Sequence, residues 1–242
     1  MNSRLNQGFS AHDDFFGNNA KHEVFPLTNF LITRPDHDDV VFYLFEWSKE
    51  LIEKARAKGI NVLDCFGKRA NKKDVEKMLK KKEPELVMFN GHGSPDCVCG
   101  QKNEILVKKG LNEAVLENKI VYARACASGK ELGQSCVKKG AKAYIGYKED
   151  FCFWVNNFTT ATPLKDEFAK PFFEATNQIV ESLLSGQTVA GSQARSLSVF
   201  DEKIEQFKRS NAPPEAEYIL PLLYWDKNIQ TIHGNENAKL EL

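Results

Sequence analysis

Short apolar segments alternate with longer amphipathic segments along most of this chain, and this alternation constrains the fold more than any other feature. Apolar segments of five to ten residues, bounded by Gly, Pro or polar residues, are typical of buried β-strands. Apolar residues that recur every three or four positions are typical of helices with one buried face. Strands that alternate with helices favour a mainly parallel sheet covered on both faces. The sequence therefore predicts a three-layer α/β sandwich.

The expected elements follow one another with short connections. Six strands are predicted, at residues 24–33, 60–66, 86–90, 120–125, 142–147 and 218–224. Helices are predicted from residue 38 or 39 to about 58, and at 72–82, 111–118, 130–139, 171–185 and 189–209, with a long loop at 151–170. Pro221 favours an edge position for the last strand, because proline has no N–H for a ladder hydrogen bond. Residues 1–22 are expected to form a loose arm, and residues 23–242 a single domain.

The composition excludes several classes of function. The 242 residues include 33 Lys and Arg against 33 Asp and Glu, so no net charge draws the chain to nucleic acid or to an anionic membrane. The longest apolar run, residues 218–225, is too short to cross a bilayer. No continuous apolar leader opens the chain, and six cysteines are too few for a disulfide scaffold. We therefore expect a cytoplasmic protein with reduced thiols and no nucleic-acid or membrane partner.

Two consecutive central strands end in residues that can carry chemistry. His92, between two glycines, follows strand 86–90, and Cys126, between two alanines, follows strand 120–125. The carboxyl ends of neighbouring parallel strands meet at one edge of a sheet, so we expect the two side chains to lie together although 34 positions separate them. A thiol and an imidazole are the minimum set for acyl transfer, because the sulfur attacks a carbonyl and the imidazole protonates the leaving amine.

The residues around Cys126 favour its thiolate form. Ser128 begins an S-x-x-E capping box, which predicts a helix beginning near residue 129 with its positive end close to the sulfur. Arg124 and Lys130 add nearby positive charge. The backbone N–H groups of Gly93 and Cys126 are candidates for an oxyanion hole.

Each of these residues also has a plainer interpretation. A single His or Cys after a strand usually packs without a chemical role, and it is the joint placement that favours function. His92, Cys97, Cys99 and Cys126 form an alternative zinc set, but the C-x-C spacing is tighter than in most zinc sites and a metal on His92 would remove the acid. The dinucleotide, P-loop and serine-hydrolase motifs are absent from the sequence. We therefore expect neither a metal nor a cofactor.

The blocks VMFNGHGS and IVYARACASG resemble the His and Cys signature blocks of the caspase-like (clan CD) cysteine peptidases. The stretch GAKAYIGY, with the long loop and helix after it, is similar to gingipain and CHAT domains, and the resemblance covers residues 86–195. It implies a caspase-like fold, Cys126 as nucleophile, His92 as general acid, no metal, and an extended peptide substrate paired with a sheet edge. The separation of 34 residues is shorter than the roughly 50 of caspases, which places the chain nearer the gingipain and CHAT branches.

The specificity of such a peptidase stays open between two interpretations. In this family the side chain two positions before the nucleophile lines the pocket for P1, the residue that precedes the cut. Here that side chain is Arg124, which favours an acidic P1 residue. Glu149 and Asp150, after the fifth strand, are an alternative acidic pocket for Lys or Arg, or else ion-pair partners of Arg124. Trp154 and its aromatic neighbours form either a peptide-binding wall or a cover over the core.

Two functions from different classes fit the sequence. The first is an endopeptidase that forms a thioester acyl-enzyme and depends on an activating partner or a cleavage if the loop at 151–170 closes the site. The second is a catalytically silent caspase-like module for interaction or sensing.

Overall fold

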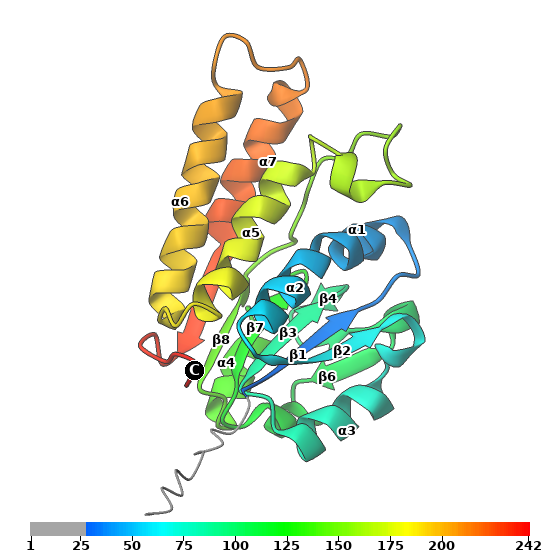
Figure 1. Cartoon of the computed structure of the whole chain (residues 1–242), viewed down its shortest axis with the longest axis vertical. Helices are drawn as coiled ribbons and strands as arrows, with labels where there is room; N and C mark the ends of the chain where they lie inside the picture. The colour runs from blue at the N-terminus through cyan, green and yellow to red at the C-terminus, as the bar shows by residue number, and fades with distance from the viewer. Residues whose placement is uncertain (1–27) are drawn as a thin grey trace, which may run out of the picture.

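The computed structural model describes residues 28–242, and a six-stranded sheet forms their centre (Figure 1). The strands lie in the order β2-β1-β3-β7-β8-β9; the first five are parallel, and β9 is antiparallel to β8. Their bounds are β1 (Asn29–Arg34), β2 (Asn61–Phe66), β3 (Leu86–Asn90), β7 (Ile120–Arg124), β8 (Ala143–Tyr147) and β9 (Gln230–Gly234). Every residue of β3, β7 and β8 is buried, because these strands are covered on both faces. The predicted arm, residues 1–22, lies outside the described residues.

Helices cover both faces of this sheet and make three layers, which confirms the predicted α/β fold class (Figure 1). The residues of β3 alternate between the faces: Leu86 and Met88 pack into a larger core, and Val87 and Phe89 pack into a smaller one. The larger core includes α1 (Asp39–Trp47), α2 (Lys49–Ala57), α5 (Lys170–Leu183), α6 (Val189–Phe207) and α7 (Ala216–Ile229). The smaller core includes α3 (Lys72–Lys82), α4 (Leu132–Lys138) and a second, antiparallel sheet of β4 (Gly93–Ser94), β5 (Cys97–Cys99) and β6 (Ile105–Lys108). Short 3₁₀ turns lie at Gly67–Arg69, Gln101–Asn103, Glu113–Leu116 and Pro163–Lys165.

The predicted sixth strand at 218–224 is wrong, because this segment lies within helix α7. The buried residues Ile219, Leu223 and Asp226 recur every three or four positions, which is a helical period, whereas Tyr218 and Trp225 are exposed. The sixth strand is instead β9, a short and largely polar segment that pairs with β8. The pairing with β8, and not a strand propensity visible in the sequence, decides its structure.

Four further differences lie in the segments that connect the strands. The helix predicted from residue 38 or 39 to 58 divides at Ser48, whose buried side-chain hydroxyl donates a hydrogen bond to the carbonyl of Phe45. The helix predicted at 111–118 is only a 3₁₀ turn, and the helix predicted at 130–139 begins at Leu132. The sheet β4-β5-β6 has no counterpart in the sequence prediction, because strands of two to four residues are too short to show a period.

Candidate active site

The loops that carry His92 and Cys126 lie side by side at the carboxyl end of the sheet. Strands β3 and β7 are parallel neighbours, and Asn90 at the end of β3 pairs with Arg124 at the end of β7. His92 and Cys126 each follow two residues later. A Cβ atom placed on Gly93 would lie 2.7 Å from the carbonyl oxygen of Cys126, so the two loops touch through their backbones. The strand-end rule thus brings the predicted loops together as expected.

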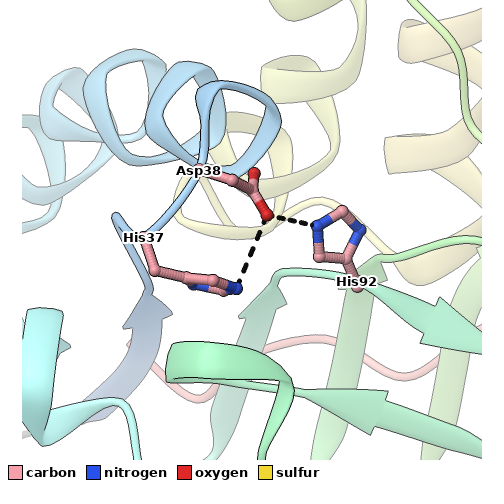
Figure 2. Close-up of side chains that lie close together, drawn as sticks. All are labelled: His37, Asp38 and His92. Carbon is pink, nitrogen blue, oxygen red and sulfur yellow. Dashed lines mark hydrogen bonds and ion pairs between the residues drawn. The ribbon is translucent and has the colours of Figure 1, made fainter.

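The imidazole of His92 is held by a carboxylate that the sequence did not identify as functional. The His92 Nε2 atom lies 2.8 Å from Oδ2 of Asp38 (Figure 2). Asp38 is the N-cap of α1, and its Oδ1 accepts a hydrogen bond of 2.9 Å from the N–H of Val41. Partial burial works against ionisation, but these two hydrogen bonds outweigh it and lower the pKa of Asp38. Asp38 is therefore a carboxylate that can orient the imidazole, although 54 positions separate the two residues.

A second histidine lies on the same carboxylate. The Nε2 atom of His37 is 3.5 Å from Oδ2 of Asp38, and its ring centroid is 6.1 Å from that of His92 (Figure 2). The same nitrogen lies 3.2 Å from Oδ1 of Asn103. His37, for which the sequence offers no partner at a recognisable spacing, therefore becomes a neighbour of the site only through the fold.

The thiol of Cys126 is half-buried beneath the segment that follows β8. Its Sγ lies 3.8 Å from the carbonyl oxygen of Phe151. Burial, with a smaller contribution from the nearby carboxylate of Asp150, raises the pKa of the Cys126 thiol to about 11. The described conformation therefore holds a neutral thiol at neutral pH.

The expected stabilisation of the thiolate is wrong for this conformation. Helix α4 begins at Leu132, and the N–H groups of Glu131 and Leu132 at its start donate to the carbonyl of Pro95. The Ser128 hydroxyl donates to the carbonyl of Ala125 instead of capping a helix. The Lys130 side chain forms an ion pair with Glu149, with 3.1 Å between Nζ and Oε1. The capping box of the sequence is therefore a coincidence of spacing.

The turn after β7 is strained at the residue that follows Cys126. Ala127 has a φ of 51°, which an alanine adopts only at a cost of about 1 kcal/mol or more. Backbone hydrogen bonds from Ala127 to the carbonyl of Glu149, and from Gly129 to that of Tyr147, tie this turn to the end of β8. Strain that the surroundings enforce at one residue is frequent at functional turns, and here it fixes the backbone that carries the sulfur.

Arg124 does not lie where the sequence analysis put it. Its side chain is completely buried on the face covered by α5, where its guanidinium donates to Oδ1 of Asn90 at 3.0 Å, Oγ1 of Thr176 at 3.2 Å and Oδ1 of Asn177 at 3.0 Å. It forms no ion pair with Glu149 or Asp150. A buried guanidinium with these partners has no donor facing a substrate, so the predicted role of Arg124 in binding an acidic P1 side chain is wrong.

Buried polar contacts of Asn90 instead join the ends of three strands. Its Nδ2 donates to the carbonyl of Thr33 in β1, its backbone N–H donates to the Thr33 hydroxyl, and its Oδ1 accepts from Arg124 in β7. Fully paired buried groups of this kind fix the relative position of the elements that carry them. Arg124 and Asn90 therefore fix the relative position of the strand ends that carry the His92 and Cys126 loops.

The other predicted binding residues occupy different positions around the sulfur. Glu149 and Asp150 are exposed; Glu149 pairs with Lys130, whereas Asp150 is near enough to Cys126 to raise the pKa of its thiol. Trp154 is half-buried and stacks on Tyr218 of α7, with 5.0 Å between ring centroids. The structure thus brings Asp150 to the sulfur and places Trp154 against helix α7.

A buried carboxylic acid in α7 also lies beneath this segment. Oδ1 of Asp226 accepts a hydrogen bond of 3.1 Å from the N–H of Cys152, and its Oδ2 has no partner among residues 28–242. Burial raises the pKa of Asp226 well above the ordinary value, and its charge contributes to the raised pKa of Cys126. Asp226 was not a predicted site residue, because the residues before it predict a strand that ends before position 226.

The zinc set considered in the sequence is not formed by the described residues. Cys97 and Cys99 are buried on β5, with their sulfur atoms 3.9 Å apart. The His, Cys and carboxylate groups of residues 28–242 that converge within reach of one metal ion are His37, Asp38 and His92. A hollow of about 700 Å³ between Glu85, Lys119 and Glu241 lies at the amino-terminal end of the strands, away from this site. No helix among the described residues is both long and apolar enough to span a membrane.

Comparison with known proteins identifies the fold. No protein-family model and no curated protein matches the sequence. Among solved structures, the Arg specific cysteine proteinase gingipain R has a TM-score of 0.55 at 14% identity, over 88% of this chain and 47% of that chain. The complex of Porphyromonas gingivalis RgpB pro- and mature domains has a TM-score of 0.54 at 12% identity, over 88% and 48%.

A third structure is less similar. The inactive zymogen of a C11 protease from Parabacteroides distasonis has a TM-score of 0.36 at 10% identity, over 86% of this chain and 84% of that chain, a score too low to establish a common fold. The chain spans about half the length of the two gingipain chains that it matches. The expected similarity to CHAT proteases stays a prediction. The chain has the caspase-like α/β fold of the gingipain cysteine peptidases.

Proposed function

We propose that this chain is a cysteine endopeptidase with Cys126 as nucleophile and His92 as general acid. The observation that carries the proposal is the contact between their two loops at the carboxyl end of β3 and β7, with Asp38 hydrogen-bonded to the imidazole. The sulfur gives its proton to His92 and attacks the peptide carbonyl, a C–S bond forms as the C–N bond breaks, and His92 passes the proton to the leaving amine. Water then hydrolyses the thioester. Asp38 acts as a positioning residue that keeps the imidazole ring in one orientation.

Two backbone amides are available for the oxyanion of this reaction. The N–H of Cys99 donates to the carbonyl of His92, so residues 92 and 99 are a hydrogen-bonded pair of the antiparallel ladder. The alternation of that ladder turns the N–H of Gly93 away from β5, and the Gly93 backbone lies against that of Cys126. We assign the N–H groups of Gly93 and Cys126 to the oxyanion hole.

The described conformation is a resting one that must open for an extended peptide to bind. The carbonyl of Phe151 lies on the Cys126 sulfur, and the rings of Phe151 and Phe153 pack against each other and against Phe173 of α5. Movement of residues 150–155, by a cleavage or by an activating partner, exposes the sulfur. The same movement removes the burial that keeps the thiol neutral.

The charges beside the sulfur support a basic P1 residue. With Arg124 buried, the predicted acidic preference has lost the residue on which it depended. Asp150 is an exposed carboxylate close enough to Cys126 to raise the pKa of its thiol. A Lys or Arg side chain that enters beside Cys126 would meet this carboxylate. Gingipain R, which shares the fold, is described as Arg specific. The free thiols of all six cysteines support a reducing compartment such as the cytoplasm.

Cleavage of a peptide library tests the proposal. The wild-type chain is assayed before and after limited proteolysis, with Cys126→Ala as the inactive control and Asp38→Asn as the positioning variant. We expect cleavage after Lys or Arg that Cys126→Ala abolishes, and a loss of about 10- to 100-fold for Asp38→Asn. Cleavage that persists in Cys126→Ala would show that another residue is the nucleophile.

The alternative is a silent caspase-like module, which the coverage of the Cys126 sulfur favours. A peptidyl chloromethyl ketone with a basic P1 residue distinguishes the two functions. Rapid labelling of Cys126 after limited proteolysis supports the peptidase. Labelling no faster than that of the buried Cys65 supports the module.

A further inference from the structure

Three potential metal ligands converge at the edge of the candidate active site. One ring nitrogen of His37, one ring nitrogen of His92 and one carboxylate oxygen of Asp38 all lie within 4.8 Å of one another (Figure 2). The shared oxygen is Oδ2 of Asp38, at 2.8 Å from Nε2 of His92 and 3.5 Å from Nε2 of His37. Two histidines that face the same carboxylate oxygen from different loops form a tripod for a cation.

We propose that His37, Asp38 and His92 form a Zn²⁺ site that inhibits the peptidase. The inhibitory part rests on the proposed function, because it assumes that His92 is the general acid. The binding part does not depend on it. A metal ion on the ring nitrogen of His92 that faces Asp38 replaces the hydrogen bond between them, adds positive charge beside the imidazole and prevents it from carrying the catalytic proton.

The spacing of the three ligand atoms suits zinc. With Zn–N and Zn–O bonds of about 2.0–2.1 Å, tetrahedral geometry places neighbouring ligand atoms about 3.4 Å apart. The distance of 3.5 Å between Nε2 of His37 and Oδ2 of Asp38 is already close to the tetrahedral spacing. The distance of 2.8 Å between Nε2 of His92 and Oδ2 of Asp38 must increase by about 0.6 Å when the metal binds. The side chains of His92 and Asp38 are 35% and 38% exposed, so small rotations toward solvent meet little packing resistance.

The chemistry of the ligands favours zinc over a harder cation. Two imidazoles and one carboxylate are a known zinc combination, whereas Ca²⁺ and Mg²⁺ prefer oxygen ligands alone. The hydrogen bond from the N–H of Val41 fixes Oδ1 of Asp38 and leaves Oδ2 for the metal. Oδ1 of Asn103, 3.2 Å from Nε2 of His37, is the nearest further oxygen, and solvent can supply the remaining ligand.

Zinc binding by the full-length chain tests the site directly. Isothermal titration with Zn²⁺, and with Mg²⁺ as the hard-cation control, is carried out on the wild type and on His37→Gln, Asp39→Asn and Cys126→Ala. We expect one Zn²⁺ per chain, binding weakened at least tenfold by His37→Gln, and unchanged binding for the other two variants. Asp39→Asn is the matched control, since it removes the next carboxylate in the chain, which lies outside the cluster. Circular dichroism verifies that each variant is folded.

Three results would overturn the site: no Zn²⁺ bound by the wild type, equal affinity in His37→Gln, or binding lost in Cys126→Ala, which would place the ion on the thiol. The inhibitory part is tested by peptide hydrolysis at increasing Zn²⁺. We expect His37→Gln to need at least tenfold more Zn²⁺ than the wild type for half-inhibition, and equal sensitivity would overturn this part. If the wild type hydrolyses no peptide, the proposed function fails while the titration still decides the zinc site.

Discussion

The buried polar side chains of this protein differ in how many of their polar atoms form hydrogen bonds. Arg124 and Asp166 are completely buried, and each makes at least three hydrogen bonds with neighbouring groups. Asp226 is equally buried, but among residues 28–242 only one of its two oxygens has a hydrogen-bond partner. A buried carboxyl group with one partner is costly to ionise, so Asp226 makes stability depend on pH.

Replacing Asp226 by Asn isolates that dependence. Because the pKa of Asp226 is raised in the folded chain, its contribution to stability is complete below the unfolded pKa of about 3.9 and is lost as the pH rises toward the folded value. An amide of the same shape cannot ionise. We expect Asp226→Asn to raise the free energy of unfolding at pH 8 by on the order of 1 kcal/mol, and to change it less at pH 4.5. Urea denaturation at both pH values measures this; an equal change at both would refute the assignment.

The thiol of Cys126 offers a second test at single-residue scale. The thiolate is the reactive form, and the pKa of the Cys126 thiol is about 11. We therefore expect the rate of its alkylation by iodoacetamide to increase about tenfold per pH unit between pH 7 and pH 10. Asp150→Asn removes a charge that raises this pKa, so it should increase the rate at each of these pH values. Glu149→Gln, which removes the neighbouring carboxylate paired with Lys130, is the matched control. Mass spectrometry separates Cys126 from the other cysteines, and a rate that levels off near pH 8 would contradict the raised pKa.

Sequence and structure agree on some residues of the site and differ on others for a physical reason. His92 and Cys126 were predictable because each directly follows an apolar strand, and the strand-end rule then places their loops together. Asp38 was recognisable as a helix cap but not as a partner of His92, since that contact depends on how α1 crosses the sheet. Arg124 was misplaced because alternation along β7 turns its side chain toward α5, beneath the surface.

At the scale of elements, the contact between the His92 and Cys126 loops depends on a glycine. A Cβ on Gly93 would lie 2.7 Å from the carbonyl oxygen of Cys126 and 2.9 Å from Cβ of Ala125, and neither of these atoms can rotate away. Gly93→Ala should therefore separate the loops, lower the free energy of unfolding by about 1–3 kcal/mol and reduce peptidase activity in protein that remains folded.

A second glycine supplies the control for this substitution. Gly191 lies inside helix α6, where the nearest contact of an added Cβ is the side-chain oxygen of Thr188 at 3.2 Å. Gly191→Ala should leave activity unchanged and change stability by less than about 1 kcal/mol, because the helix preference of alanine offsets the close contact of its Cβ with the capping oxygen of Thr188. Thermal unfolding and peptide hydrolysis are measured for both variants. Equal behaviour of the two would show that the contact at Gly93 is not tight.

The elements near the site also show which parts of the fold a sequence pattern can predict. The buried strands β3, β7 and β8 are continuous apolar segments and the helices α3, α5 and α6 have a helical period, so all six were predicted within a few residues. Helix α7 was taken for a strand because its run of apolar residues hides a helical period behind exposed aromatic side chains. Strand β9 and the sheet β4-β5-β6 are stabilised by pairing with neighbours, which no local pattern records.

At the scale of the whole molecule, residues 150–166 connect the two sides of the larger core across the candidate site. Asp166 accepts hydrogen bonds from the Tyr43 hydroxyl of α1 and from the N–H of Asn156. At the other end, Trp225 of α7 donates from its Nε1 to the carbonyl of Asp150 at 2.8 Å, and Asp226 accepts from Cys152. The segment that lies on the Cys126 sulfur is therefore held from α1 and from α7, and access to the sulfur depends on both.

Trp225→Phe removes the hydrogen bond between α7 and the carbonyl of Asp150 with little disturbance elsewhere. The side chain is 44% exposed, so replacing it keeps an aromatic ring while removing one hydrogen bond worth about 0.5–1.5 kcal/mol. Local opening of residues 150–155 should then increase about two- to tenfold, while the free energy of global unfolding changes little. Hydrogen exchange of these amides and the rate of Cys126 alkylation should rise together.

Tyr224→Phe, on the same helix but facing Lys208, is the matched control. If exchange rises and alkylation does not, the segment opens without exposing the sulfur, and α7 is not the element that restricts access to Cys126.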